Sequence, residues 1–590
     1  MSKSILALSV AASFFSVSAV AVDYKHYNGS PDRSKETTLP SGAIGNADSL
    51  TQLMKVTRIS KGYVAEKITV KGDRDVWMIG GALYAPVVIK GNTGLIVIST
   101  GEHNADGANF RQVIREQIGN DPIVAIIYDH SHYAYGAEAL LDGDKAIIVG
   151  HRDANAIEDS KEPGTWAVSQ VPEMGPHLNA KAFIHMGLYT PKEGIDAQLL
   201  PAFNPSEDAV FGRLPVTHPV DHDDKLVIDG IEFIFKLAET DTRDTITIYS
   251  PEMDLIVDNV LWSAINAYTL RGDTHRSPTV WIEALDDLRS FNAATVLSVG
   301  SGSNPVYGKE NVRNQVNAVR DQMAFIYDQS IRLTNQGVAP DQLKHHITMP
   351  KSLASLPYIN ESYGQWEHFP EANANFNQGW FSGRAEDLHT LPSAVEARNM
   401  IKLAGGVENV FNAYQSAMKK EEYIWAKDLA TMLYNDKPQD KKVRQALADV
   451  FRELGKLSPG LIARNFYISA ALNLEEKNEA SLVSVESEQW VKTDLARAVK
   501  FLRVRINPEK AEGVVGALTF NIDGKIVSLA IRNSVAEFVD GGIESAHSIN
   551  VSVNDFVAYY RGEKTASSIA SDKALELLAL FDEYKYISMY

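Results

Sequence analysis

The chain has no cysteine, and this absence limits the chemistry open to it. Its 590 residues include 15 histidines but 0 cysteines. Disulfide bonds and thiolate metal ligands are therefore excluded. Any metal ion must be held by histidine, aspartate or glutamate side chains.

The chain has fewer basic residues than acidic ones. The chain has 57 lysines and arginines against 75 aspartates and glutamates, which gives a formal net charge of −18. Nucleic acids and anionic membrane surfaces attract basic proteins, so neither is an expected partner. A small anionic substrate remains possible, because a few local cations can outweigh a distant field.

Long hydrophobic runs are absent after the N-terminus. The stretch "ILALSVAASFFSVSAVAV" (5–22) follows a short positive start, and Ala19-Val20-Ala21 has the small-x-small pattern of a cleavage site. The alternative is a membrane anchor, but the run is short for a span and serines interrupt it. We expect residues 1–21 to be a signal peptide that is removed. The mature protein would then be periplasmic or secreted, with no integral membrane segment.

The length predicts several domains, because a single core rarely grows to 590 residues. Strands alternate with helices between residues 75 and 299, which indicates an α/β domain. Residues 392–480 are almost entirely helical in pattern, and a small α+β pattern begins near 484. We expect domains at 22–345, 346–482 and 483–590.

The most informative stretch is "IIYDHSHYAYG" (126–136), where a predicted strand runs into a His-x-His pair. Two imidazoles at this spacing can reach one ion, and two nitrogens suit zinc or a similar metal. The pair alone is weak evidence, because His130 and His132 could equally be two polar loop residues.

Other stretches make the pair more specific. The loop resembles the His-x-His-x-Asp-His loop of metallo-β-lactamase-fold hydrolases. Within that group, four further stretches resemble the alkyl sulfatase family in wording and order. They are "DNVLWSAINAYTLRGD" (258–273), "YDQSIRLTNQGV" (327–338), "NQGWFSGRAEDLHTLPSAVEA" (377–397) and "INPEKAEG" (506–513).

The resemblance covers nearly the whole mature chain and implies a fold and an activity. Members of this family are exported, dimeric enzymes with two zinc ions that cleave long-chain primary alkyl sulfates such as dodecyl sulfate. The implied fold class is α/β, an αββα metallo-β-lactamase sandwich. An all-α dimerisation domain and a lipid-carrier-like C-terminal α+β domain would follow it, which matches the three predicted regions.

The family's metal ligands can be carried over one at a time. His130 and His132 match the first two histidines of the loop. In "LAETDTRDT" (237–245) Asp241 is the nearest match to the first acidic ligand, with Glu239 close by. Asp258 stands where the family has a bridging glutamate. The predicted metal set is therefore His130, His132, Asp241 and Asp258.

Other family ligands are replaced. Ala134 and Tyr135 stand where the family has aspartate and histidine, and Gly302 and Ser303 replace a His-His pair. Methyl and phenol groups cannot substitute for a carboxylate and an imidazole, so we expect one zinc ion per chain and not two. Tyr135 is a candidate catalytic residue that could hydrogen-bond a substrate oxygen, or it could simply fill the space.

Nearby polar residues could compensate for the lost ligands. Glu102, His103 and His151 each follow a predicted strand, although they could equally be solvated loop residues. Asp129 directly precedes His130, but alternation along a strand would point it away from that histidine.

The anion site is better preserved. The resemblance assigns the sulfate group to Asn266 and Arg271, which stand at the family's spacing. Arginine suits this task because its planar fork gives two parallel hydrogen bonds to an oxyanion.

Three functional hypotheses follow. The first is a homodimeric metal-dependent hydrolase that cleaves the sulfate ester of a small amphiphilic anion at an altered, one-metal site. The second is a non-catalytic relative that binds such an anion. The third is a structural or partner-binding role through the helical region. Asn266 and Arg271 favour the first two, and the surviving histidine pair favours the first.

Overall fold

The structure is a computed structural model. It describes residues 36–46, 62–82, 84–159, 172–199, 210–262, 264, 266–268, 270–272, 276–300, 303–356, 361–583 and 587–590. The predicted signal peptide and Gly302 lie outside the described residues.

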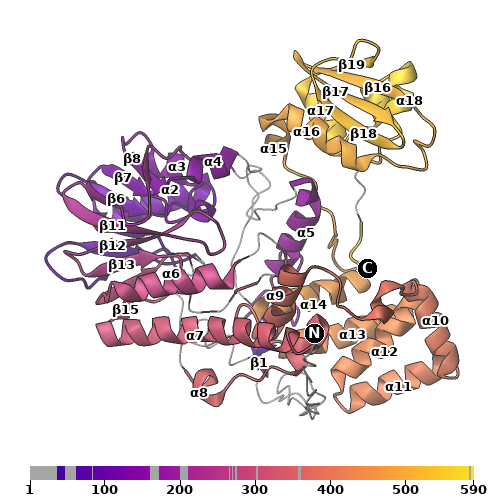
Figure 1. The fold of residues 1–590 in the computed structure, drawn as a ribbon, viewed down its shortest axis with the longest axis horizontal. Coiled ribbons are helices and arrows are strands. Elements are labelled where there is room, and N and C mark those ends of the chain that lie inside the picture. Colours follow the sequence, from indigo (N-terminus) through magenta and orange to yellow (C-terminus); the bar gives the residue numbers. More distant parts are fainter. Residues whose placement is uncertain are drawn as a thin grey trace, which may run out of the picture.

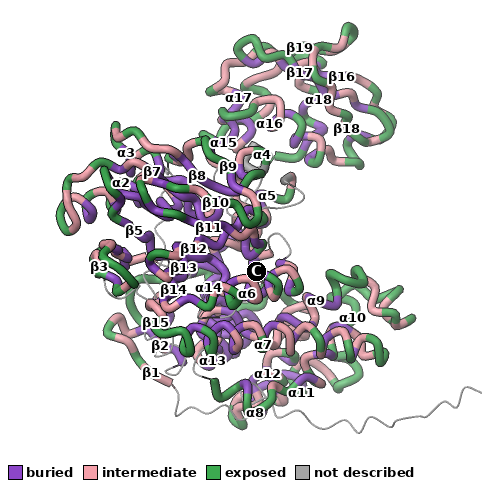
Figure 2. Tube along the Cα trace, turned by 60° about the vertical axis from the view of Figure 1, so that its left-hand side comes forward, coloured by how far each residue is buried: buried purple, intermediate pink, exposed green. Residues whose placement is uncertain are grey.

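Two β-sheets stack face to face to form the first domain (Figure 1). Seven strands form one sheet: β3 (Ala65–Ile68), β4 (Val76–Ile79), β5 (Val87–Lys90), β6 (Leu95–Ile98), β7 (Ile123–Ile127), β8 (Ile147–His151) and β9 (His218–Val220). Six strands form the other: β10 (Lys225–Ile228), β11 (Ile231–Ala238), β12 (Thr245–Ser250), β13 (Leu255–Asp258), β14 (Thr295–Ser298) and β15 (Val306–Tyr307). Branched and aromatic side chains from both sheets form the core between them. Figure 2 shows this buried layer.

Helices cover the outer face of each sheet. Helix α2 (Asn104–Val113), which continues as a π turn over Ile114–Ile118, and α3 (Ala137–Leu141) pack on the seven-stranded sheet. Helices α6 (Pro278–Ser290) and α7 (Lys309–Thr334) pack on the six-stranded sheet. The layers therefore run helix, sheet, sheet, helix, and the predicted αββα sandwich is confirmed.

One sequence-based expectation is wrong in detail. The apolar pattern over 226–236 predicts a single strand, but the chain forms a hairpin of β10 and β11. The turn is Asp229-Gly230, with positive φ angles of 44° and 83°. An Asp-Gly pair is a strong hairpin signal, and the surrounding apolar residues obscured it.

A helical region follows the sandwich. Its helices are α9 (Phe369–Gln378), α10 (Ser393–Leu403), α11 (Val407–Lys419), α12 (Tyr423–Asp436), α13 (Lys441–Leu457) and α14 (Leu461–Leu474). The apolar faces of α10 to α14 pack against one another. Among the described residues, none of the helices combines the length and hydropathy needed to cross a membrane.

The C-terminal region is a four-stranded sheet with helices on it. The strand order is β18 (Val535–Asp540), β17 (Lys525–Arg532), β16 (Gly516–Ile522) and β19 (His547–Val551). The accompanying helices are α15 (Glu488–Thr493), α16 (Leu495–Leu502), α17 (Val553–Tyr560) and α18 (Asp572–Leu578). This region projects from the rest of the chain, next to α5 (Gly175–His185) (Figure 1). The α+β class is confirmed, while the domain boundaries at 345 and 482 stay predictions.

Candidate functional site

The histidine loop lies at the carboxyl end of β7 and is held from both sides. His130 has extended backbone, and Ser131–Tyr133 form a short 3-10 turn. The backbone N–H and hydroxyl of Ser131 donate to Asp244 Oδ1 at 3.2 and 2.9 Å. The N–H of Gly101, in the loop after β6, donates to the carbonyl of Tyr133 at 3.0 Å. These bonds fix the direction in which both histidines point.

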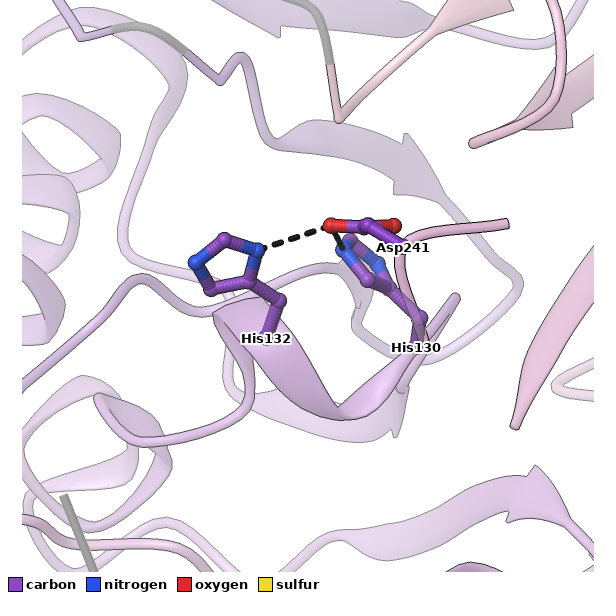
Figure 3. Close-up of side chains that lie close together, drawn as sticks. All are labelled: His130, His132 and Asp241. Atoms are coloured by element: carbon purple, nitrogen blue, oxygen red, sulfur yellow. Dashed lines mark hydrogen bonds and ion pairs between the residues drawn. The ribbon is translucent and has the colours of Figure 1, made fainter. Parts of the chain in front are cut away.

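His130, His132 and Asp241 converge on one point (Figure 3). One potential ligand atom from each lies within 4.8 Å of the others, and all three residues are buried. Asp241 Oδ2 is 2.8 Å from His132 Nδ1 and 3.6 Å from His130 Nε2. Two imidazole nitrogens and one carboxylate oxygen are a donor set that zinc and similar ions accept.

The orientation of His130 comes from its neighbour Asp129. Asp129 Oδ2 is 2.7 Å from His130 Nδ1. His130 Nε2 is buried and has no hydrogen-bond partner among the described residues. The expectation that Asp129 points away is wrong, because β7 ends at Ile127 and strand alternation does not extend to it. A carboxylate on the outer nitrogen is the usual support of a metal-binding imidazole.

Asp241 is ionised and correctly placed for a cation. Burial alone would raise its pKa, but His130 and His132 hold that pKa well below its ordinary value. Asn259 Nδ2 donates to Asp241 Oδ1 at 2.8 Å, and Thr240 Oγ1 donates to the same oxygen at 3.0 Å. The other oxygen, Oδ2, is the one that faces the histidines.

Asp258, the fourth predicted ligand, lies outside this cluster. Its Oδ1 accepts the backbone N–H groups of Val260 and Leu261 at 2.6 and 2.7 Å, and its Oδ2 accepts the Ser298 hydroxyl at 3.4 Å. Burial raises the pKa of Asp258 to about 6. Aspartate is one methylene shorter than the family's glutamate, and here it caps the turn after β13.

Of the three possible substitutes, Glu102 lies beside the cluster. Its Oε1 is 3.8 Å from His132 Nε2. Burial, reinforced by the nearby Asp106, raises the pKa of Glu102 well above its ordinary value, and Arg271 opposes this shift. Glu102 therefore lies on the outer side of His132, beyond hydrogen-bond distance.

The other two substitutes have structural contacts. His103 Nδ1 accepts the N–H of Asp106 at 3.3 Å and so caps α2. His151 Nδ1 accepts the N–H of Asp153 at 3.0 Å.

At two positions where the family has metal ligands, Ala134 and Tyr135, the backbone makes contacts with Gly101. Ala134 is buried and forms a β-bridge with Gly101. The Tyr135 ring packs edge-on against Phe211 at 5.6 Å, and its N–H donates to the carbonyl of Gly101 at 2.9 Å. The catalytic role of Tyr135 stays a prediction.

Tyr133, which the sequence reasoning passed over, packs against both histidines. Its ring stacks on His132 at 4.5 Å and meets His130 edge-on at 5.0 Å. The sequence contained a signal for Tyr133. It lies after the two histidines and before the next helix, so its side chain must pack beside the two histidines. Tyr133 excludes water from one side of the cluster.

The predicted anion-binding residues are both buried. Asn266 and Arg271 are 5% and 4% exposed. The charge of Arg271 lowers the pKa of both Glu102 and His132, where burial is the largest cause of each shift. Arg276, five residues further along, donates from Nη1 to the Asn266 carbonyl at 2.7 Å.

Two further residues face these arginines. His185 ends α5, and its Nε2 is 3.0 Å from the hydroxyl of Tyr363. Burial and the charges of Arg271 and Arg276 hold the pKa of His185 well below its ordinary value. No spacing rule links positions so far apart in the chain, so sequence reasoning missed this pair.

The fold and the site define a class of protein: an αββα protein with a His-His-Asp cluster beside buried arginines. Sequence comparison then identifies the family. Residues 339–477 match the family model for alkyl sulfatase dimerisation. A linear primary-alkylsulfatase of Pseudomonas sp. (strain ATCC 19151) is 31% identical over 479 residues, which cover 77% of this chain and 88% of that protein. The chain belongs to the alkylsulfatase family.

More distant relatives are also alkylsulfatases or alkyl/aryl-sulfatases by name. An alkyl/aryl-sulfatase of Saccharomyces cerevisiae is 23% identical and covers 84% of this chain and 79% of that protein. Among solved structures, the stereoselective inverting sec-alkylsulfatase of Pseudomonas sp. covers 95% of this chain and 93% of that one, with a TM-score of 0.70 at 17% identity. This structural likeness extends the shared fold over all three regions.

Proposed function

We propose that the protein is an exported metal-dependent hydrolase that cleaves the sulfate ester of an apolar alcohol, such as dodecyl sulfate. This proposal is based on one observation: a group of potential metal ligands and an arginine are both buried. His130, His132 and Asp241 form a cation site, and the buried Arg271 lies beside it. A sulfate ester needs both, because its bridging and outer oxygens carry the charge that develops during cleavage.

One ion is the proposed content of the site. The donors that remain together are His130 Nε2, His132 Nδ1 and Asp241 Oδ2. When bound, a zinc-like ion supplies Lewis-acid charge and an activated water at this point. Ala134, Tyr135 and Ser303 offer no carboxylate or imidazole for a second ion.

The chain's own residues do the remaining work. Asp129 orients His130 from outside the cluster. Arg271 binds the sulfate oxygens with its guanidinium fork, and Asn266 assists on the same segment. Tyr133 covers the histidines and keeps water from that side.

A cavity at the helical region is a candidate site for the apolar part of the substrate. Leu270 lines a cavity of about 870 Å³ that extends to the helical region. Its apolar wall consists of Leu270, Ile424, Trp425, Ala463, Phe466 and Tyr467. Charged side chains, among them Lys344, Glu367 and Lys427, line the rest. We propose that an alkyl tail would lie against the apolar wall.

The second candidate is binding without turnover. The replaced ligands favour it, since a site that holds one ion offers less charge to the transition state. The anion-binding residues would then serve an exported protein that captures amphiphilic anions.

The proposal can be tested with protein that has been purified without chelator. The protein is incubated with octyl sulfate or dodecyl sulfate, and the released sulfate and alcohol are both quantified. We expect slow release that added zinc increases. Arg271→Ala should weaken alkyl sulfate binding, whereas Arg532→Ala, an exposed arginine of β17, should not. Binding with no release under any metal would favour the second candidate. Neither binding nor release would refute both.

A further inference from the structure

A buried asparagine supports the carboxylate of the cation site. Asn259 is 0% exposed and directly follows β13. Its Nδ2 donates to Asp241 Oδ1 at 2.8 Å and to Thr240 Oγ1 at 3.1 Å. Because the amide holds this outer oxygen, the other oxygen of Asp241, Oδ2, faces the two histidines. The orientation of the Asn259 amide therefore affects how well Asp241 can bind a cation.

Trp262 determines that orientation. Its indole N–H donates to Asn259 Oδ1 and to the Asn259 carbonyl, each at 3.0 Å. An indole N–H is a donor only, so it must face the oxygen of the side-chain amide and not the nitrogen. In the reversed orientation, two N–H groups would meet at Trp262 and two oxygens would meet at Asp241. The amide therefore has one orientation that satisfies both neighbours.

Gly300 limits the space around the same amide. A Cβ atom at this position would lie 1.5 Å from Asn259 Oδ1 and 2.5 Å from Asn259 Cγ. The Gly300 carbonyl also accepts the hydroxyl of Tyr133 at 3.3 Å, and the Tyr133 ring stacks on His132. The backbone that packs against the amide is thus itself held by the residue that covers the histidines.

The ring of Trp262 contacts the segment that carries the predicted anion-binding residues. The guanidinium carbon of Arg276 lies 5.4 Å from the ring centre, and Arg276 is 3% exposed. Its Nη1 donates to the Asn266 carbonyl at 2.7 Å. The face of an indole ring attracts a cation, so the ring helps to fix this arginine. A continuous series of contacts therefore connects Asp241 with Asn266.

We propose that Trp262 is a positioning residue for both halves of the site. Its N–H orients Asp241 for the ion through Asn259. Its ring fixes, through Arg276, the segment that would bind the sulfate group. The inference rests on the proposed function and deepens it, since it names one side chain on which binding of both the ion and the anion depends.

Two substitutions separate the N–H from the ring. Trp262→Phe keeps an aromatic face for Arg276 but removes the donor to Asn259. In the full-length protein we expect its zinc affinity, measured by competition with a chromogenic chelator, to fall about 10-fold, the lower end of the usual effect of losing such a support. Trp262→Leu removes the ring as well. Calorimetry at saturating zinc should show that Trp262→Leu binds octanesulfonate, which has no ester to cleave, about 10-fold more weakly than the native protein. Trp262→Phe should stay within a few-fold in that measurement.

Trp281 provides a matched control. Its indole N–H donates to the Val260 carbonyl at 2.9 Å, and its ring meets that of Trp262 edge-on at 4.9 Å. Trp281→Phe therefore removes an indole N–H from the same cluster without removing the donor to Asn259. It should lower Tm and leave zinc affinity unchanged. Asn259→Ala, which removes the amide itself, should lower zinc affinity at least as much as Trp262→Phe.

Each half of the proposal can fail separately. Unchanged zinc affinity in Trp262→Phe and Asn259→Ala would refute the half that concerns the ion. Equal losses of zinc affinity in Trp262→Phe and Trp281→Phe would show that both indoles only support the fold. Unchanged octanesulfonate affinity in Trp262→Leu would refute the half that concerns the anion. A native protein that binds zinc but neither binds nor cleaves octyl sulfate would refute the proposed function, whereas the zinc affinities would still decide whether Asn259 orients Asp241.

Discussion

At the scale of single residues, the two histidines face the ion site with different nitrogens. His130 uses Nε2 and His132 uses Nδ1 toward Asp241. Each remaining ring nitrogen lies near a second acid, Asp129 for His130 and Glu102 for His132. The hydrogen bond of Asp129 therefore leaves the Nε2 lone pair of His130 pointing inward.

The role of Asp129 can be tested by a substitution of equal size. In Asp129→Asn the amide can offer its N–H to His130 Nδ1, which would leave the proton on Nε2 and block the inward lone pair. We expect zinc affinity to fall about 10- to 100-fold, the usual cost of losing such a support. Competition with a chromogenic chelator measures this. Asp540→Asn, on an exposed strand, is the matched control, and unchanged affinity in Asp129→Asn would contradict the assignment.

The number of ions per chain is a second prediction at this scale. Protein purified without chelator should contain about one zinc-like ion, because one set of donors converges. Replacing His130 and His132 by alanine together should remove it. Elemental analysis by mass spectrometry decides this. Two ions per chain would contradict the prediction and would point to Glu102 as an extra ligand.

At the scale of elements, hydrophobic periodicity predicted most of the first domain, and the resemblance to the alkyl sulfatase family predicted the histidine pair with Asp241. These features depend on neighbours in sequence. The side chain of Asp258 caps a local turn, which motif matching does not reveal, and its role as a metal ligand stays a prediction. His185 and Tyr363 were missed because α14 brings them together, and tertiary packing of this kind leaves no local pattern.

The loop before α9 carries a buried acid with a measurable effect on stability. Glu361 accepts the N–H of Trp366 at 2.9 Å. Burial raises the pKa of Glu361 to about 8 from an ordinary 4.5. The folded state thus keeps a proton that the unfolded state has lost. Between pH 4.5 and about pH 8, rising pH therefore lowers the contribution of Glu361 to the free energy of unfolding.

Glu361→Gln should remove part of this dependence, since its amide cannot ionise. The Tm of the native protein should fall between pH 6 and pH 9, and the variant should lose less over the same interval. Thermal unfolding followed by circular dichroism gives both values. Glu537→Gln, an exposed acid of β18, should behave like the native protein. An equal fall in the Glu361→Gln variant would show that Glu361 ionises normally.

At the scale of the whole molecule, apolar side chains remain exposed on the helical region. They lie between residues 376 and 403, within the span that matches the alkyl sulfatase dimerisation family. Trp380 is 79% exposed and Leu403 is 81% exposed. Phe376, Leu388, Leu391 and Met400 are also exposed on this segment. Exposed apolar patches of this kind mark association surfaces, and the family match indicates a second copy of the chain as the partner.

We therefore expect a two-fold dimer at micromolar concentration, with the 376–403 segment at its interface. The variant Trp380→Glu/Leu403→Glu should shift the protein to monomer, because two carboxylates would lose hydration without a counter-charge in the interface. Light scattering coupled to size-exclusion chromatography measures the mass. Val227→Glu, an exposed apolar residue of β10, should leave the dimer intact. A native monomer would contradict the dimer itself. A dimeric double variant would place the interface on another surface of the helical region. The KM for octyl sulfate can also be compared between dimer and monomer, and a difference would show that dimerisation affects α14 and the residues that this helix positions.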